Sequence, residues 1–152
     1  METAVPGAAC IDEGCESMKT RILPAEVGRL DEVNALIDGV LEPYNCSSKT
    51  QMEIALAVEE IFVNIANYAY SLQKGQAEIV VDVWGEPPVL TVCFLDWGKP
   101  FNPLAKQDAD ITLSAEERGI GGLGIFLVKK LMDDVSYLYE DGKNILTIRK
   151  RL

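Results

Sequence analysis

The chain has 152 residues, which suits one ordinary domain built around a single core. Apolar residues make up 48% and charged residues 25% of it, a globular composition rather than a disordered one. Asp and Glu total 24 against 14 Lys and Arg, so the formal net charge is -10. Such a charge repels phosphate backbones and acidic lipid surfaces, which argues against nucleic-acid and membrane partners. No apolar run approaches the roughly 18 residues that a membrane-spanning helix needs.

Small residues, proline and acids fill residues 1–15, which we interpret as a flexible tail before one domain over 16–152. The tail lacks the basic start and apolar stretch of a secretory signal. The chain contains no histidine, which excludes histidine-based acid–base and triad chemistry. The four cysteines, Cys10, Cys15, Cys46 and Cys93, form no Cys-x-x-Cys pair, and a chain of this length buries a core without disulfides. We therefore expect reduced thiols and a cytoplasmic protein.

Hydrophobic periodicity predicts the elements in chain order. They are a strand over 17–23, a helix over 25–41, a second helix from Ser47–Thr50 to about Tyr70, a hairpin of strands over 78–84 and 89–95, a long loop over 98–119, a helix over 124–132, and a second hairpin of strands over 135–139 and 145–149. This order predicts an α+β protein, a two-layer sandwich of helices on a sheet. A loop of that length in a small domain is usually functional.

The second helix is apolar almost all round, yet Glu60, Asn64 and Asn67 form one polar stripe at positions i, i+4 and i+7. These groups either bond neighbouring backbone and reach solvent at an edge, or they form the face of a ligand site. An Asn carbonyl is an oxygen ligand suited to Mg²⁺, and a Glu one turn away can hold a hydroxyl or a water for attack. Glu59 lies next to Glu60, but the i, i+4 alignment with Asn64 favours Glu60 as the carboxylate of the site.

Asp96 and Gly98 end a predicted strand and begin the long loop. An Asp there can accept a hydrogen bond from an exocyclic amine, while a Gly lets the backbone approach a flat ring. The same pattern is also typical of a simple Asx turn.

The segment Gly119-Ile120-Gly121-Gly122-Leu123-Gly124 matches the GxGxxG dinucleotide pattern, and Glu140 lies near the spacing of a ribose-binding acid. The context argues against a Rossmann site, because no strand directly precedes Gly119 and only a hairpin follows the helix. A glycine-rich turn into a helix still presents free N–H groups and a positive dipole end to phosphates.

Taken in order, Glu60-x-x-x-Asn64, Asp96-x-Gly98 and Gly122-Leu123-Gly124 resemble the N, G1 and G2 boxes of the GHKL (histidine-kinase-like) ATPases. The short chain, the segments 96–103 and 122–133, and the terminal hairpin are similar to the bacterial anti-sigma factor serine/threonine kinases. The resemblance implies the histidine-kinase-like ATPase (Bergerat) fold, with a mixed, mostly antiparallel sheet and helices on one face.

The resemblance also implies roles at the matching positions. Glu60 would be the catalytic base, Asn64 would bind Mg²⁺ at the ATP phosphates, and Asp96 would read the adenine amino group beside Gly98. The full set that we expect at ATP is Asn64, Asn67, Tyr68, Asp96, Gly98, Arg118, Gly119, Gly121, Gly122, Leu123, Gly124 and Ile125. Tyr68 stands where family members often have His, and Asn67 where many histidine kinases have Lys. Arg118 would supply a cation at the γ-phosphate from the nucleotide lid over 100–119.

The activity implied is an ATP-dependent serine/threonine kinase that phosphorylates a STAS-type anti-anti-sigma protein and sequesters a sigma factor in a partner switch. A non-catalytic module that binds ATP or ADP and acts by sequestration alone is the alternative. The first strand and first helix would form a homodimer surface, although core packing alone also explains their apolar positions. No phosphoacceptor His exists, which excludes the autokinase role of a histidine kinase.

Overall fold

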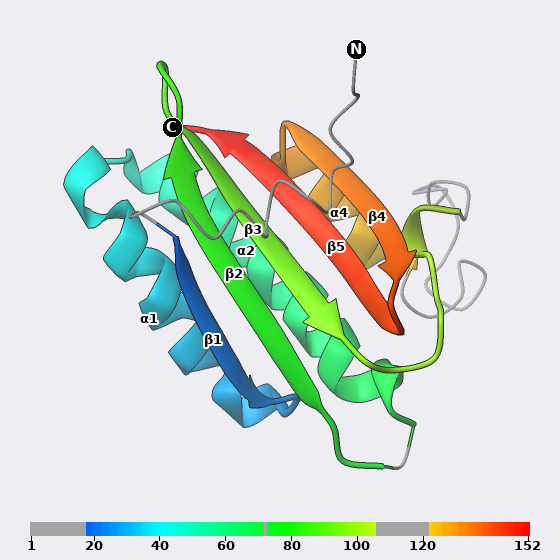
Figure 1. The fold of residues 1–152 in the computed structure, drawn as a ribbon. Helices are drawn as coiled ribbons and strands as arrows, with labels where there is room; N and C mark the ends of the chain where they lie inside the picture. The colour runs from blue at the N-terminus through cyan, green and yellow to red at the C-terminus, as the bar shows by residue number, and fades with distance from the viewer. Residues whose placement is uncertain (1–17, 72, 106–121) are drawn as a thin grey trace.

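The computed structural model describes residues 18–71, 73–105 and 122–152, which form a five-stranded sheet with helices on one face (Figure 1). The strands are β1 (Lys19–Pro24), β2 (Gln76–Trp84), β3 (Val89–Asp96), β4 (Asp134–Glu140) and β5 (Lys143–Arg151). The helices are α1 (Leu30–Leu41), α2 (Ser48–Asn64), a π-helix (Ile65–Ala69) and α4 (Gly122–Leu131), with 3₁₀ turns at Val27–Arg29, Glu42–Tyr44 and Pro103–Ala105. The predicted α+β sandwich is confirmed.

The sheet has the order β1-β2-β3-β5-β4, and each of its four neighbouring pairs is antiparallel. The mostly antiparallel sheet is therefore confirmed, but the parallel pairing of a mixed sheet is not found between the described strands. The reason lies in the topology. Strands β3 and β4 point the same way, yet β5 lies between them and runs opposite to both.

Local sequence signals set most of the boundaries. The side chain of Ser47 accepts a hydrogen bond from the N–H of Thr50 at 3.1 Å, which confirms the predicted N-cap of α2. Asp141 and Gly142, with φ of 53° and 76°, form the two-residue turn that joins β4 and β5. The second helix differs from prediction at its end, where α2 stops at Asn64 and the π-helix continues to Ala69.

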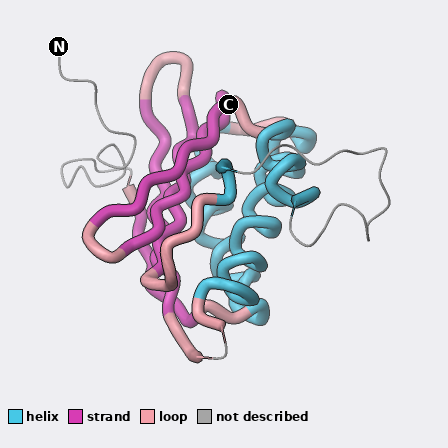
Figure 2. The backbone as a smooth tube through the Cα atoms, turned by 90° about the vertical axis from the view of Figure 1, so that its right-hand side faces the viewer, coloured by secondary structure: helices cyan, strands magenta, loops and turns pink. Residues whose placement is uncertain are grey.

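The core lies between the inner face of the sheet and the helices, which Figure 2 shows as two layers seen edge-on. Alternate residues of β2, β3 and β5 point into this layer and meet the apolar faces of α1, α2 and α4. The largest fully buried side chains there include Phe62, Phe94, Ile79, Ile148, Val33 and Val128. This packing fixes the end of α2 beside the end of β3, where the polar residues singled out above converge.

Candidate functional site: a nucleotide-sized cavity

A cavity of about 510 Å³ lies between the end of α2, the end of β3, the start of α4 and the hairpin β4–β5. Its wall is mostly apolar and carries a small set of polar groups, the usual character of a small-molecule site. The lining residues are Glu60, Ile61, Asn64, Ile65, Asn67, Tyr68, Ala69, Ser71, Phe94, Asp96, Lys99, Phe101, Pro103, Ile125, Val128, Tyr137, Asn144 and Leu146. Residues of the first two predicted motifs, Glu60 with Asn64 and Asp96, therefore line one cavity, together with Ile125 directly after the third motif.

The polar stripe of α2 faces this cavity. Glu60 and Asn64 both line it, and within the described residues neither side chain has a hydrogen-bonding partner. Glu59 is exposed and does not line the cavity, which favours Glu60 over its neighbour as the carboxylate of the site. Asn67 and Tyr68 also line the wall, with Tyr68 about half exposed.

The π-helix begins directly after Asn64, and sequence periodicity gave no sign of it. Wider i→i+5 turns are rare and frequently occur at functional sites. Here the wider turn ends at Ala69, against which Gly98 packs. A Cβ built on Gly98 would stand 2.2 Å from the carbonyl oxygen of Ala69, so no larger residue fits without moving backbone. The glycine of the Asp96-x-Gly98 motif is thus required by a close approach of two backbones.

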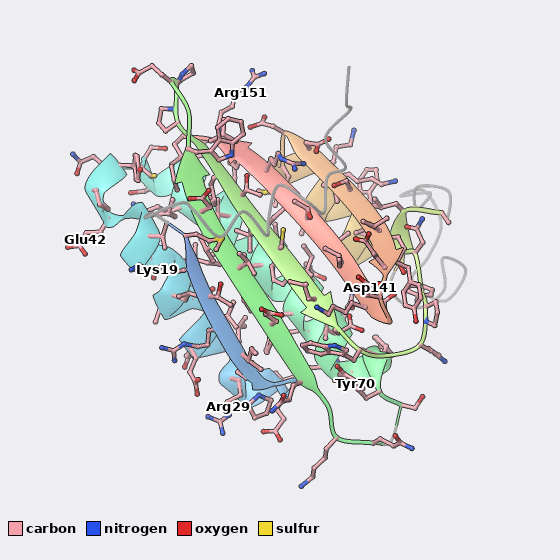
Figure 3. All side chains as sticks on the ribbon, viewed as in Figure 1. Lys19, Arg29, Glu42, Tyr70, Asp141 and Arg151 are labelled. Carbon is pink, nitrogen blue, oxygen red and sulfur yellow. The ribbon has the colours of Figure 1, made fainter. Side chains whose placement is uncertain are left out.

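Tyr70 ties the same two segments together. Its hydroxyl accepts a hydrogen bond from the Trp97 N–H at 2.8 Å and donates one to the carbonyl of Gln76. Figure 3 shows Tyr70 where the end of α2 meets the loop that follows β3. Burial raises the pKa of Tyr70, so its hydroxyl stays protonated and remains a donor. The loop after Asp96 therefore contacts the helix end twice, through the Trp97–Tyr70 hydrogen bond and through Gly98 against Ala69.

Asp96 is a buried carboxylate, only 6% exposed. Its Oδ1 accepts hydrogen bonds from the Gly98 N–H at 3.0 Å and from Asn144 Nδ2 at 2.9 Å. The Asx turn expected as the simpler interpretation is thus present, but it uses one carboxylate oxygen. No described residue donates to Oδ2, which can accept a bond from a ligand amine. Burial raises the pKa of Asp96, and the two hydrogen bonds lower it by less.

Asn144 on β5 is the residue that the sequence analysis missed. Besides its bond to Asp96, its Nδ2 donates to the carbonyl of Lys99 at 3.0 Å. Its Oδ1 accepts from the Phe101 N–H at 3.0 Å and from the Tyr137 hydroxyl. A lone Asn at the start of a strand carries no motif. Its position opposite Asp96 follows from the antiparallel register of β3 and β5, which the sequence does not state.

The start of α4 closes the cavity beside Glu60. A Cβ built on Gly124 would stand 2.5 Å from Glu60 Oε2 and 3.9 Å from Asn64 Nδ2. Free N–H groups at a helix start attract phosphates, and here they lie next to the Asn64 amide. Gly122 and Leu123 belong to the first turn of α4, and Ile125 lines the cavity. The predicted residues Arg118, Gly119 and Gly121 lie outside the described residues.

The cavity fits a magnesium nucleotide on these observations. Asp96 Oδ2 offers an acceptor to a base, Lys99 a cation, and α4 a glycine-bordered helix start. Within the described ranges no three His, Cys, Asp or Glu side chains gather as a metal cage. Asn64 would be a single protein ligand, which suits Mg²⁺ that keeps its waters and phosphate ligands.

A second cavity, of about 690 Å³, lies between the end of α1 and the start of α2. Its wall contains Asp38, Glu42 and the half-buried Cys46, and no basic residue. Two carboxylates without a cation repel phosphates, which makes this a poor nucleotide site.

Among the helices of the described segments, none has the length and apolar character that crossing a membrane requires.

Comparison with known proteins identifies the family of the chain. The sequence profile of the histidine kinase-like ATPase domain matches residues 23–150. A serine-protein kinase RsbW from Listeria monocytogenes is 29% identical over 128 residues, covering 82% of this chain and 81% of that protein. A serine-protein kinase RsbW from Bacillus mycoides is 24% identical over 128 residues, covering 82% and 79%.

A solved structure is similar in fold. The crystal structure of the RsbU and RsbW domains of a Mycobacterium tuberculosis protein superposes with a TM-score of 0.62 at 15% identity, covering 89% of this chain and 32% of that one. The chain thus spans about a third of that longer protein and most of the curated relatives. With a family profile that covers most of its length, the chain belongs to the histidine kinase-like ATPase domain family.

Proposed function

We propose that the chain is an ATP-dependent protein serine/threonine kinase of the anti-sigma factor type. Its protein substrate is a STAS-type anti-anti-sigma protein, and its second partner is a sigma factor that it sequesters. The observation that carries the proposal is the convergence of Glu60, Asn64 and Asp96 in one cavity bordered by the start of α4. The names of the Listeria and Bacillus relatives support the same activity.

Each wall of the cavity has one task. Asp96 accepts a hydrogen bond from the adenine amino group on its free Oδ2, and Gly98 leaves room for the ring. The backbone at Gly122–Gly124 donates to the phosphates, and Asn64 is the protein ligand for Mg²⁺. Mg²⁺, when bound, neutralises charge on the phosphates. Positioning and charge neutralisation are most of what phosphoryl transfer needs from a protein.

Glu60 orients the acceptor hydroxyl of the substrate serine and accepts its proton. Its side chain stands at the start of α4, within 2.5 Å of the place where a Gly124 Cβ would lie, and thus close to the phosphate end of the cavity. The absence of any described hydrogen-bonding partner leaves its carboxylate available to a substrate. General-base assistance of this kind contributes roughly 10²–10⁴-fold to a rate.

The protein surface supports an association through β1. This strand is at an edge of the sheet, and Ile22 on it and Val27 just after it are 56% and 49% exposed. Besides these apolar side chains, the exposed residues of β1 include Lys19 and Arg21, and an edge strand has unpaired N–H and C=O groups that another chain can bind. We propose the homodimer here, and light scattering on the purified protein measures it directly.

The test is phosphate transfer from MgATP to the cognate STAS-type protein. For Glu60→Gln we expect transfer to fall by about 100-fold or more, while ATP still raises the melting temperature as it does in the unaltered protein. Glu59→Gln is the matched control, because Glu59 is the exposed neighbour outside the cavity, and it should retain transfer.

The outcomes separate the two functions. Equal loss in both variants, or loss only in Glu59→Gln, would overturn the role of Glu60. If the unaltered protein binds ATP but transfers no phosphate, the kinase proposal fails. The non-catalytic module that acts by sequestration would then stand in its place.

A further inference from the structure

The face of the sheet opposite the helices carries a small buried cluster, which we call the outer-face cluster: Val80, Cys93, Leu95 and Ile145. Their exposed fractions are 6%, 0%, 2% and 3%. Figure 2 shows that the helices lie on the other side of the sheet, so none of them accounts for this burial. Among the described residues, Met18 is the partly buried hydrophobic residue that packs against the cluster.

Polar atoms on the same face are also shielded from water. Thr91 alternates with Cys93 along β3, and Ser136 pairs with Thr147 across β4 and β5. The side-chain oxygens of Thr91 and Ser136 are buried and have no hydrogen-bonding partner among residues 18–71, 73–105 and 122–152. Buried hydroxyls on an open sheet face require a covering chain.

The disulfide bond of Cys93 indicates which segment covers this face. Its sulfur lies 3.2 Å from the Thr147 hydroxyl and is disulfide-bonded, whereas Cys46 is free. The expectation of reduced thiols is therefore wrong for Cys93. The two cysteines that remain, Cys10 and Cys15, both precede Met18, and residues 106–121 contain none.

The length and charge of residues 1–17 are compatible with a disulfide from Cys10 or Cys15 to Cys93. An extended chain spans about 3.3–3.6 Å per residue, so Cys15 reaches about 10 Å and Cys10 about 27 Å from Met18. Met18 itself already contacts the cluster. Residues 1–17 carry four acids and no base, and the outward positions of β5 include Arg151 and Arg149, of which Arg149 is also paired with Asp134 at 2.8 Å.

We propose that residues 1–17 cover the outer face of the sheet and are held there by a disulfide from Cys93 to Cys10 or Cys15, which reduction releases. Forming the S–S bond removes two electrons and two protons from the two thiols. A small-molecule disulfide such as oxidised glutathione takes them up and becomes two thiols, through a mixed disulfide. This makes Cys93 a redox site on the face of the sheet away from the nucleotide cavity.

The first test counts thiols. Alkylation of the denatured protein after incubation with oxidised glutathione should modify two of the four cysteines, and all four after reduction. Trypsin then leaves Cys10 and Cys15 on one peptide linked to the peptide of Cys93, and cleavage after Glu13 separates the two. Cys46→Ser should retain the link. Four free thiols under oxidising conditions, or a link between two chains on a non-reducing gel, would overturn the proposal.

The second test measures the cover itself. A glutamate-specific protease should cut after Glu13 and Glu16 at least about tenfold more slowly in the oxidised protein than in the reduced one. The double variant Cys10→Ser/Cys15→Ser leaves Cys93 in the sheet and should be cut at the fast rate in both buffers. Equal rates for the oxidised and reduced unaltered protein would show that the segment is not held on the sheet.

Discussion

Asp96 is a buried carboxylate with one oxygen bonded inside the protein and the other free for a ligand. Desolvation raises the pKa of Asp96, so folding disfavours the ionised form of this carboxyl group. We therefore expect Asp96 to contribute to ligand binding rather than to stability. Active sites commonly hold groups of this kind, and replacing them often stabilises a protein at the expense of activity.

Replacing Asp96 with Asn tests this balance. Because the folded-state pKa is raised, the folded protein binds more protons than the unfolded one, and the free energy of unfolding falls as the pH rises through the titration of this group. We expect Asp96→Asn to remove that fall, so its stability advantage over the unaltered protein grows as the pH rises from the ordinary pKa of an Asp to the raised pKa of Asp96. Denaturant unfolding at several pH values measures it. An advantage that shrinks with rising pH would contradict the direction of the shift.

Asn144 acts on Asp96 from the neighbouring strand. Asn144→Ala removes the acceptor that the Tyr137 hydroxyl and the Phe101 N–H share in a half-buried position, which costs about 0.5–1.5 kcal/mol of unfolding free energy for each bond. It also frees Asp96 to turn, so we expect weaker ATP binding by isothermal calorimetry. Tyr137→Phe is the control, because it removes one bond and leaves the Asp96 contact intact. Equal ATP affinity in Asn144→Ala and the unaltered protein would remove Asn144 from the site.

Two glycines, Gly98 and Gly124, lie where the elements around the cavity approach one another most closely. Gly98 brings the loop after β3 onto the end of the π-helix, and Gly124 brings α4 onto Glu60. A wider helical turn between Asn64 and Ala69 supplies the backbone that Gly98 approaches. The cavity is therefore a product of how closely four elements approach one another.

Gly124→Ala tests whether activity depends on the close approach of α4 to Glu60. Its Cβ would overlap Glu60 Oε2 at 2.5 Å, so either Glu60 or the first turn of α4 must move. We expect phosphate transfer to fall by at least about tenfold, a change of about 1.4 kcal/mol in the barrier. Gly39→Ala in α1 is the matched control, since nothing lies within 4 Å of its Cβ. It should retain activity and stabilise the protein by about 0.5–1 kcal/mol. Full activity in Gly124→Ala would argue against a fixed contact there.

At the scale of the whole molecule, a nucleotide in the cavity would join both layers, because the wall takes residues from α2, α4, β3 and the β4–β5 hairpin. A ligand that binds only the folded state stabilises all of it together. At 100 times its Kd this amounts to about 2.7 kcal/mol, or about 5–10 °C in a domain of this size.

A thermal-shift panel of ATP, ADP and NADH, each with and without Mg²⁺, measures this linkage. We expect stabilisation by ATP and ADP with Mg²⁺ and none by NADH, because the described strands pair only antiparallel, whereas a Rossmann site is built on parallel strands. Asp96→Asn should lose the shift. A response to NADH alone would favour the dinucleotide interpretation that we rejected.

The sequence predicted the features that depend on residues close together along the chain. Periodicity located the strands and helices to within a few residues, Ser47 marked the start of α2, and Asp141-Gly142 marked the last turn. Spacing alone aligned Glu60 with Asn64 on one helix face. The ordered motifs identified the family that the profile match confirms.

Tertiary structure decided what depends on residues far apart in the chain. The register of β3 against β5 places Asn144 beside Asp96, 48 positions earlier, and the packing of α4 on α2 places Gly124 against Glu60. The same holds for the wider turn after Asn64, for the order of strands that keeps β3 and β4 apart, and for the bonded sulfur of Cys93. Sequence determines local backbone preference and which face is apolar. Contacts between distant segments are chosen only when the whole core packs, because each is stable only with the others in place.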